Sequence, residues 1–245
     1  MSYDKVVVTG CSYVEGRKFS ENHFGKVLSK HFESTYINLG SHGSSNDYSY
    51  LRIMKWLNNT WKVEKFSKSN MNCKDDDRVL VVFGISQFTR LHKWNNIIDN
   101  HDTFWLNKLI DNSSVHDFDF IKDITEFESE KTRQNFINFY IKYFYNEEFF
   151  RDKLEDKLIF LHNYLENKNG KLVVFNSLDD FEPKLNRLNF FRFPINEGWE
   201  DENNWKSHCV YKEKNEGWEW DGHPSEYGNL DLGKKLLKFL GENND

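Results

Sequence analysis

The chain has 245 residues, of which 38% are hydrophobic and 17% aromatic, enough to bury the core of a single domain. Its formal net charge is −6 at pH 7 and it contains no lysine or arginine block, which argues against binding to phosphate backbones. We therefore expect no nucleic-acid partner.

The three cysteines are Cys11, Cys73 and Cys209, widely spaced and without a C-x-x-C pair. This pattern indicates free thiols rather than a disulfide framework or a zinc site. The N-terminus lacks the long apolar stretch of a secretory signal, and no later apolar run reaches the length of a membrane span. We expect a soluble, cytoplasmic protein, which in a viral setting would lie in the host cytoplasm or the virion.

The N-terminal part of the chain alternates strand and helix patterns. Val6–Val8 is a continuous apolar run, typical of a strand buried on both faces, and Thr35–Gly40 fits a second strand. Two helical faces are expected, made of Phe24, Val27, Leu28 and Phe32, and of Tyr48, Leu51, Met54, Leu57 and Trp61. Ser45 or Asn46 can cap the second of these helices.

The alternation continues toward the C-terminus. Val79–Phe83 and Leu172–Phe175 are further continuous apolar runs, and Gly170 can end the long helical stretch before the second of them. An aromatic stripe with helical spacing is expected in the core; it comprises Phe136, Phe139, Tyr140, Tyr143 and Phe144. Residues from about 86 to 130 and from about 177 to 220 fit the alternation poorly, and we expect them to be irregular insertions.

Strands that alternate with helices and are apolar throughout predict a three-layer α/β/α sandwich with a central, mostly parallel sheet. We expect residues 1–245 to form it as a single domain. Ligands of such sheets bind at the carboxyl ends of the strands. Three loops should converge there, at Gly10–Ser12, Gly40–Asn46 and Gly84–Gln87.

A histidine near the C-terminus adds a fourth polar group. Asp221 and His223 precede a proline and the apolar-periodic tail of a final helix. A histidine placed by a tight turn beside a carboxylate is suited to act as a general base. An isolated Asp-x-His is more often a solvated turn, but its combination with the three loops is informative.

Together these four segments resemble the motif blocks of the SGNH hydrolase superfamily, the GDSL-type esterases. That family has Gly-Asp-Ser with a glycine four residues after the serine, a glycine following Asn-x-x-x-x, Gly-x-Asn-Asp, and Asp-x-x-His-Pro. The matching segments here are Gly10–Gly16, Asn38–Gly43, Gly84–Gln87 and Asp221–Pro224. The resemblance spans almost the whole chain and implies the same flavodoxin-like three-layer fold.

The resemblance also implies roles for individual residues. Ser12 matches the nucleophile, His223 the base that takes its proton, and Asp221 the carboxylate that orients the imidazole. The backbone N–H groups of Ser12 and Gly43 would donate to the oxyanion, with Ser86 as the third member of the oxyanion hole. Glycine suits position 43 because a Cβ there would crowd the substrate and the loop needs a positive φ.

Three positions depart from the family pattern. Cys11 replaces the aspartate of the first block, Ser86 replaces the oxyanion-hole asparagine, and Asp221 precedes His223 by two residues instead of three. Loss of an oxyanion donor typically lowers the rate about a hundred- to a thousandfold, so reduced activity is expected. Gln87 or Asn46 could supply the missing amide, although Asn46 could equally serve as a helix cap.

The leading hypothesis is a serine hydrolase that cleaves an ester bond to a small or carbohydrate-borne acyl group through an acyl-enzyme. Two alternatives stay open: a catalytically weakened binding module or virion component with this fold, and an acyltransferase. Arg90, just beyond the third block, could bind a substrate carboxylate or phosphate, or form a surface ion pair. With Asn46 and Gln87 it completes the candidate substrate-binding residues.

No metal or organic cofactor is implied. The histidines outside the fourth block include His116, His162 and His208, which lack the spacing of a metal site and are expected to be solvated or to cap turns. The expected partner is a small-molecule or carbohydrate ester, and the pattern predicts no particular oligomeric state.

Overall fold

The computed structural model describes residues 2–16, 21–60, 72–88, 90–95, 100–105, 130–193, 204–216 and 223–241. Its centre is a five-stranded parallel sheet in the order β2-β1-β3-β6-β7. The strands are β1 (Lys5–Thr9), β2 (Thr35–Asn38), β3 (Val79–Ile85), β6 (Lys171–Asn176) and the short β7 (Phe190–Phe191). All four strands expected from the apolar runs are confirmed, and β7 is additional.

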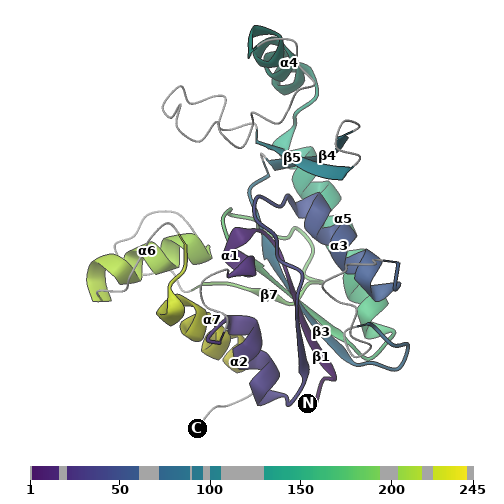
Figure 1. Ribbon diagram of the computed structural model, residues 1–245, viewed down its shortest axis with the longest axis vertical. Coiled ribbons are helices and arrows are strands. Elements are labelled where there is room, and N and C mark those ends of the chain that lie inside the picture. The colour runs from purple at the N-terminus through teal and green to yellow at the C-terminus, as the bar shows by residue number, and fades with distance from the viewer. Residues whose placement is uncertain are drawn as a thin grey trace.

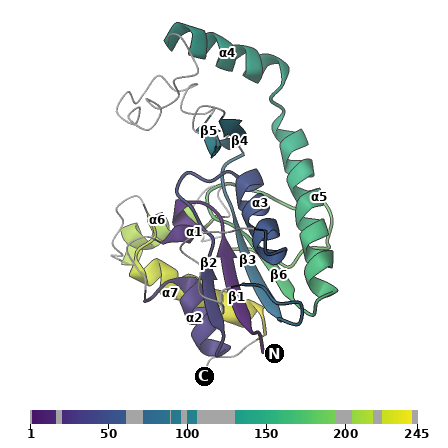
Figure 2. The same ribbon diagram turned by 45° about the vertical axis from the view of Figure 1, so that its right-hand side comes forward.

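Helices cover both faces of this sheet (Figures 1 and 2). One face carries α2 (Phe24–His31), α6 (Trp205–Glu216) and α7 (Glu226–Phe239), and the other carries α3 (Asn46–Leu57) and α5 (Glu147–Glu166). Along β1, Val6 and Val8 belong to the first of these apolar layers and Val7 to the second. The three-layer α/β/α prediction is therefore confirmed. None of the described helices has the length and apolar composition of a membrane span.

Two helix ends show how the polar loops are anchored. Ser45, not Asn46, caps α3, because its Oγ accepts a hydrogen bond from the backbone N–H of Tyr48 at 3.1 Å. The long helix α5 ends at Glu166, and the N–H of Gly170 donates to the carbonyl of Leu165 at 2.8 Å. The side chain of Asn46 is therefore free of the cap and is used elsewhere.

The two segments expected to be irregular contain regular structure. The first includes an antiparallel pair of strands, β4 (Arg90–Asn95) and β5 (Asn100–Trp105), and the second includes α6 and β7. A two-stranded ribbon needs no continuous apolar run, which is why it escapes a search for buried strands. In α6 the sequence is mostly polar, and the buried apolar side chains among its described residues, Trp205 and Cys209, are only one turn apart.

The prediction that the aromatic stripe lies in the core is wrong. The stripe lies on and just after α4 (Glu130–Tyr143), which projects away from the sheet in both views (Figures 1 and 2). Phe139 is 52% exposed and Tyr143 60% exposed, while the side chain of Phe136 lies outside the described residues. Helical spacing shows that side chains share a face, but it does not show whether another element covers that face.

The short helix α1 (Ser12–Glu15) lies at the carboxyl end of β1 and packs tightly onto the sheet. A Cβ built on Gly84 would lie 2.4 Å from Cγ2 of Val14, and one built on Gly10 would lie 2.6 Å from the same atom. Real Cβ atoms do not approach other carbons this closely. The two glycines therefore provide the space that Val14 fills.

We expect Gly84→Ala to lower the free energy of unfolding by about 1–3 kcal/mol, because the new methyl group overpacks a buried site. Urea denaturation of the variant measures this loss. Val14→Ala should cost less in the Gly84→Ala protein than in the parent protein, because it removes the methyl group that clashes. Equal costs in the two backgrounds would contradict the proposed packing of Val14.

Candidate active site

Ser12 lies at the edge of the sheet because β1 ends only three residues before it. The strand stops at Thr9, and α1 begins with Ser12 and ends at Glu15, followed by the C-cap residue Gly16 with a φ of 60°. Cys11 is fully buried, with its Sγ 3.8 Å from Ser177 Oγ. The thiol of Cys11 therefore lies inside the fold, next to the loop after β6.

The structure brings Ser12 and His223 together from opposite ends of the chain. His223 Nε2 lies 3.2 Å from Ser12 Oγ, within hydrogen-bond distance, although 211 positions separate the two residues. His223 is exposed and directly precedes the N-terminal turn of α7, where Ser225 Oγ accepts a hydrogen bond from Gly228 N–H. Asp221, the expected orienting carboxylate, lies outside the described residues.

Tyr13 flanks the imidazole of His223. The two ring centroids are 5.0 Å apart with an interplanar angle of 37°. Tyr13 itself is buried, and burial raises the pKa of its phenol, while the positive charge of Arg90 acts in the opposite direction. The side chain is therefore a neutral, well-packed wall beside an exposed histidine.

Two backbone amides and one hydroxyl were expected to form the oxyanion hole. Gly43 has a φ of 69°, which confirms the expectation of a left-handed conformation at this position. Ser86 is fully buried, and its Oγ has no hydrogen-bond partner among the described residues. The Ser86 hydroxyl therefore lies closed off from the surface.

The amide of Asn46 is bonded to the backbone of Ser86. Ser86 N–H donates to Asn46 Oδ1 at 2.7 Å, and Asn46 Nδ2 donates to the carbonyl of Ser86 at 2.9 Å. This reciprocal pair joins the start of α3 to the loop after β3. Gln87 is also engaged, because its Oε1 accepts from Arg90 Nε at 3.3 Å. Asn46 and Gln87 thus fix the third loop and position Arg90.

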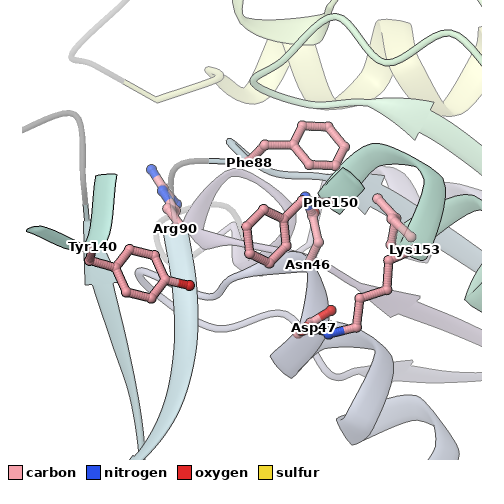
Figure 3. Close-up of a pocket in the computed structure, with 8 residues that line it drawn as sticks. Asn46, Asp47, Phe88, Arg90, Tyr140, Phe150 and Lys153 are labelled. Atoms are coloured by element: carbon pink, nitrogen blue, oxygen red, sulfur yellow. Dashed lines mark ion pairs between the residues drawn. The ribbon is translucent and has the colours of Figure 1, made fainter. Parts of the chain in front are cut away.

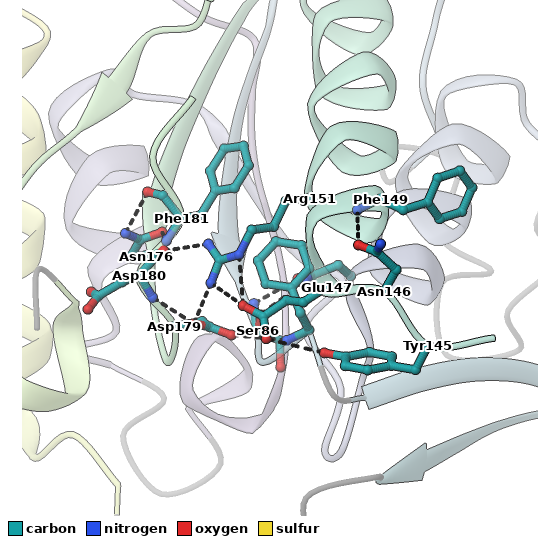
Figure 4. A network of polar contacts seen from close by, with 12 residues as sticks. Ser86, Tyr145, Asn146, Glu147, Phe149, Arg151, Asn176, Asp179, Asp180 and Phe181 are labelled. Atoms are coloured by element: carbon teal, nitrogen blue, oxygen red, sulfur yellow. Dashed lines mark hydrogen bonds and ion pairs between the residues drawn. The ribbon is translucent and has the colours of Figure 1, made fainter. Parts of the chain in front are cut away.

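A second polar network holds the same loop from the other side (Figure 4). Arg151 on α5 contacts Asp179 with Nη2 and Oδ1 3.3 Å apart, and Asp179 Oδ2 accepts from the N–H of Phe88 at 3.1 Å. The guanidinium of Arg151 also lies 4.6 Å from the centre of the Phe88 ring. The loop after β3 is therefore held between α3 and α5.

His23 is a structural histidine that the sequence analysis missed. Its Nδ1 accepts from Gly25 N–H at 3.0 Å, so the ring proton lies on Nε2, which donates to the carbonyl of Val14 at 2.7 Å. Burial lowers the pKa of His23 to about 4, so the ring is neutral near pH 7. Its position just before α2 marks it only as a helix cap, and no sequence signal connects it to α1.

His208 is likewise buried and paired, not solvated. Its Nε2 lies 2.9 Å from Asp231 Oδ2, which ties α6 to α7. Burial alone would raise the pKa of Asp231, but hydrogen bonds from His208 and Lys235 outweigh it, and the pKa is lowered. This contact anchors the helix that follows His223.

The pKa of His23 predicts a loss of stability in acid. Unfolded His23 binds a proton as the pH falls below about 6.5, whereas the folded protein resists protonation until about pH 4. The free energy of unfolding should thus fall by about 3 kcal/mol across this window and be fully regained above it. Urea titrations between pH 4 and 7.5 measure the slope.

His23→Gln is the matched variant, because glutamine keeps a donor and an acceptor but does not titrate. Its unfolding free energy should vary less with pH than that of the parent protein between pH 4 and 6.5. An identical pH slope in both proteins would show that His23 is not the group responsible.

Comparison with known proteins gives remote structural likenesses. No protein-family model matches the chain, and no curated protein sequence is significantly similar to it. Esterase EstA from Pseudoalteromonas sp., in a structure inhibited by monoethylphosphonate, is 10% identical over 97% of each chain, with a TM-score of 0.43. A carbohydrate esterase is 11% identical over 100% of this chain and 70% of its own, with a TM-score of 0.47.

A third solved structure, of a protein from Desulfitobacterium hafniense DCB-2 described as lipolytic and of the G-D-S-L family, is 11% identical. It aligns over 96% of this chain and 99% of its own, with a TM-score of 0.39.

Proposed function

We propose that this chain is a serine hydrolase of the SGNH type, which cleaves an ester bond to a small or carbohydrate-borne acyl group through an acyl-enzyme. One observation carries the proposal: the 3.2 Å distance between Ser12 Oγ and His223 Nε2. A hydroxyl beside an imidazole at the ligand-binding edge of a parallel sheet is the arrangement that activates a serine nucleophile.

The reaction begins when Ser12 Oγ attacks the ester carbonyl and His223 Nε2 takes its proton. The carbonyl π electrons move onto oxygen, where the N–H groups of Ser12 and Gly43 are proposed to stabilise the charge. Collapse of this intermediate breaks the bond to the leaving alcohol, which takes the proton from His223. Water then hydrolyses the acyl-enzyme by the same route in reverse, and Asp221 is proposed to hold the imidazole in the required tautomer.

The burial of the Ser86 hydroxyl favours a low rate of ester hydrolysis. Its hydroxyl is buried in the described structure, so it can reach an oxyanion only if the loop after β3 shifts. The same observation favours the second candidate function, a binding module whose hydrolysis is slow. Both candidates place the ligand at Ser12, and they differ in whether a covalent intermediate forms.

A neutral fluorophosphonate probe separates these two candidates, because it phosphonylates only a serine activated by a base. We expect Ser12 to be labelled, Ser12→Ala to be unlabelled, and His223→Ala to be labelled at least about a hundredfold more slowly. Intact-protein mass spectrometry measures the labelling. Ser34→Ala is the matched control, since Ser34 precedes β2 at the other end of the sheet. A folded parent protein that resists labelling would exclude the hydrolase.

Tyr13 is expected to position His223. Tyr13→Leu should lower the labelling rate of Ser12 about tenfold, because the imidazole loses the ring that flanks it, while Tyr13→Phe keeps that ring and should stay near the parent rate. In a His223→Ala background, Tyr13→Leu should have little further effect. An equal loss in both backgrounds would show that Tyr13 acts only through the fold.

A further inference from the structure

A hollow of about 190 Å³ lies between the loop after β3, the start of α3 and the N-terminal half of α5 (Figure 3). Its lining includes Asn46, Phe88, Arg90, Tyr140, Phe150 and Lys153. Cavities of about 150 Å³ hold a benzene ring, so this one has room for a single ring-sized group.

The strand register relates the lining of the hollow to Ser12. Thr9 of β1 pairs with Phe83 of β3, so Ser12 and Ser86 each lie three residues beyond a paired position on adjacent strands. Asn46 lines the hollow and holds the backbone of Ser86. Arg90, on the wall of the hollow, is near enough to Tyr13 for its charge to act on the phenol.

The charges around the hollow favour an anion. Arg90, only 8% exposed, and Lys153 contribute two positive charges in a chain whose formal net charge is −6. Asp47 is the one carboxylate in the described lining, and it already contacts Lys157 at 2.6 Å and Lys153 at 3.7 Å. Among the described residues of the lining, two positive charges thus stand against one negative charge, which favours an incoming carboxylate.

The other side chains of the lining are mainly aromatic. Phe88, Tyr140 and Phe150 contribute aromatic rings to the lining (Figure 3). Aromatic side chains pack against planar or ring-shaped groups. A guanidinium binds a carboxylate through paired hydrogen bonds more strongly than it binds a neutral amide.

We propose that this hollow is a substrate subsite for a carboxylate-bearing ring, so that the preferred substrates are esters that carry such a ring on the acyl or the alcohol side. The subsite rests on the proposed hydrolase function, because it places the charged ring beside Ser12. Arg90 holds the carboxylate, Lys153 adds to the positive potential, and the aromatic side chains enclose the ring.

Binding to the full-length Ser12→Ala protein tests the subsite without turnover. Calorimetric titration compares 4-carboxyphenyl acetate with 4-carbamoylphenyl acetate, and the monophenyl ester of terephthalic acid with phenyl 4-carbamoylbenzoate. Each pair differs only in charge, and the two pairs place the carboxylate on the alcohol or the acyl side. We expect the acid of at least one pair to bind about tenfold more tightly than its amide.

In the Ser12→Ala protein, a second substitution Arg90→Gln should remove the preference for the acid over the amide, and Lys153→Gln should reduce it. Arg90 is buried, so the exposed Lys153 provides the second variant if Arg90→Gln does not fold. Lys168→Gln is the matched control, since it removes the same charge at the far end of α5, where Lys168 pairs with Asp75. Equal binding of acid and amide in both pairs, or a preference that survives both Arg90→Gln and Lys153→Gln, would overturn the subsite.

The fluorophosphonate result keeps the two proposals distinguishable. If Ser12 is labelled but neither acid is preferred, the hydrolase stands and the subsite is wrong. If the acid is preferred but Ser12 is not labelled, the hollow binds carboxylates in a protein that is not a hydrolase.

Discussion

The candidate site depends on how tightly α1 is seated at the end of the sheet. Val14 fills space that exists only because Gly10 and Gly84 lack a Cβ. The carbonyl of Val14 accepts from His23, and that of Glu15 accepts from Asn38 Nδ2 at 2.9 Å. A four-residue helix has little stability of its own, so these contacts, and not helix propensity, determine where Ser12 points.

Packing also determines where the imidazole lies. The hydrogen bond between His223 and Ser12 is worth about 1 kcal/mol, whereas each leucine that α7 buries contributes about 1.5–3 kcal/mol. Leu232, Leu236 and Leu237 are all buried in the layer shared with α2 and α6. The apolar face of α7 therefore carries His223 to the sheet edge, and the polar contact is a consequence of that packing.

The two histidines around α1 show how environment divides one residue type into two roles. His23 is buried, its pKa is lowered to about 4, and both ring nitrogens are used within the fold. His223 is exposed and meets a serine hydroxyl. A buried neutral ring that already donates and accepts is suited to bracing a loop, while an exposed ring can exchange protons with a ligand and solvent.

The sheet, its layers and the position of Ser12 and of the 40–46 and 84–87 loops could be predicted from the residues alone, because buried parallel strands are continuously apolar and their carboxyl ends share one edge. It pointed to His223 only through resemblance to known motif blocks. The bracing by His23, the use of Asn46 on the Ser86 backbone and the hollow beside Arg90 were decided by tertiary structure alone. The same is true of the exposure of the aromatic stripe on α4. Periodicity and motif spacing reflect relations between residues that are near one another in the sequence. Burial and hydrogen-bond partners depend on segments that come into contact only after folding.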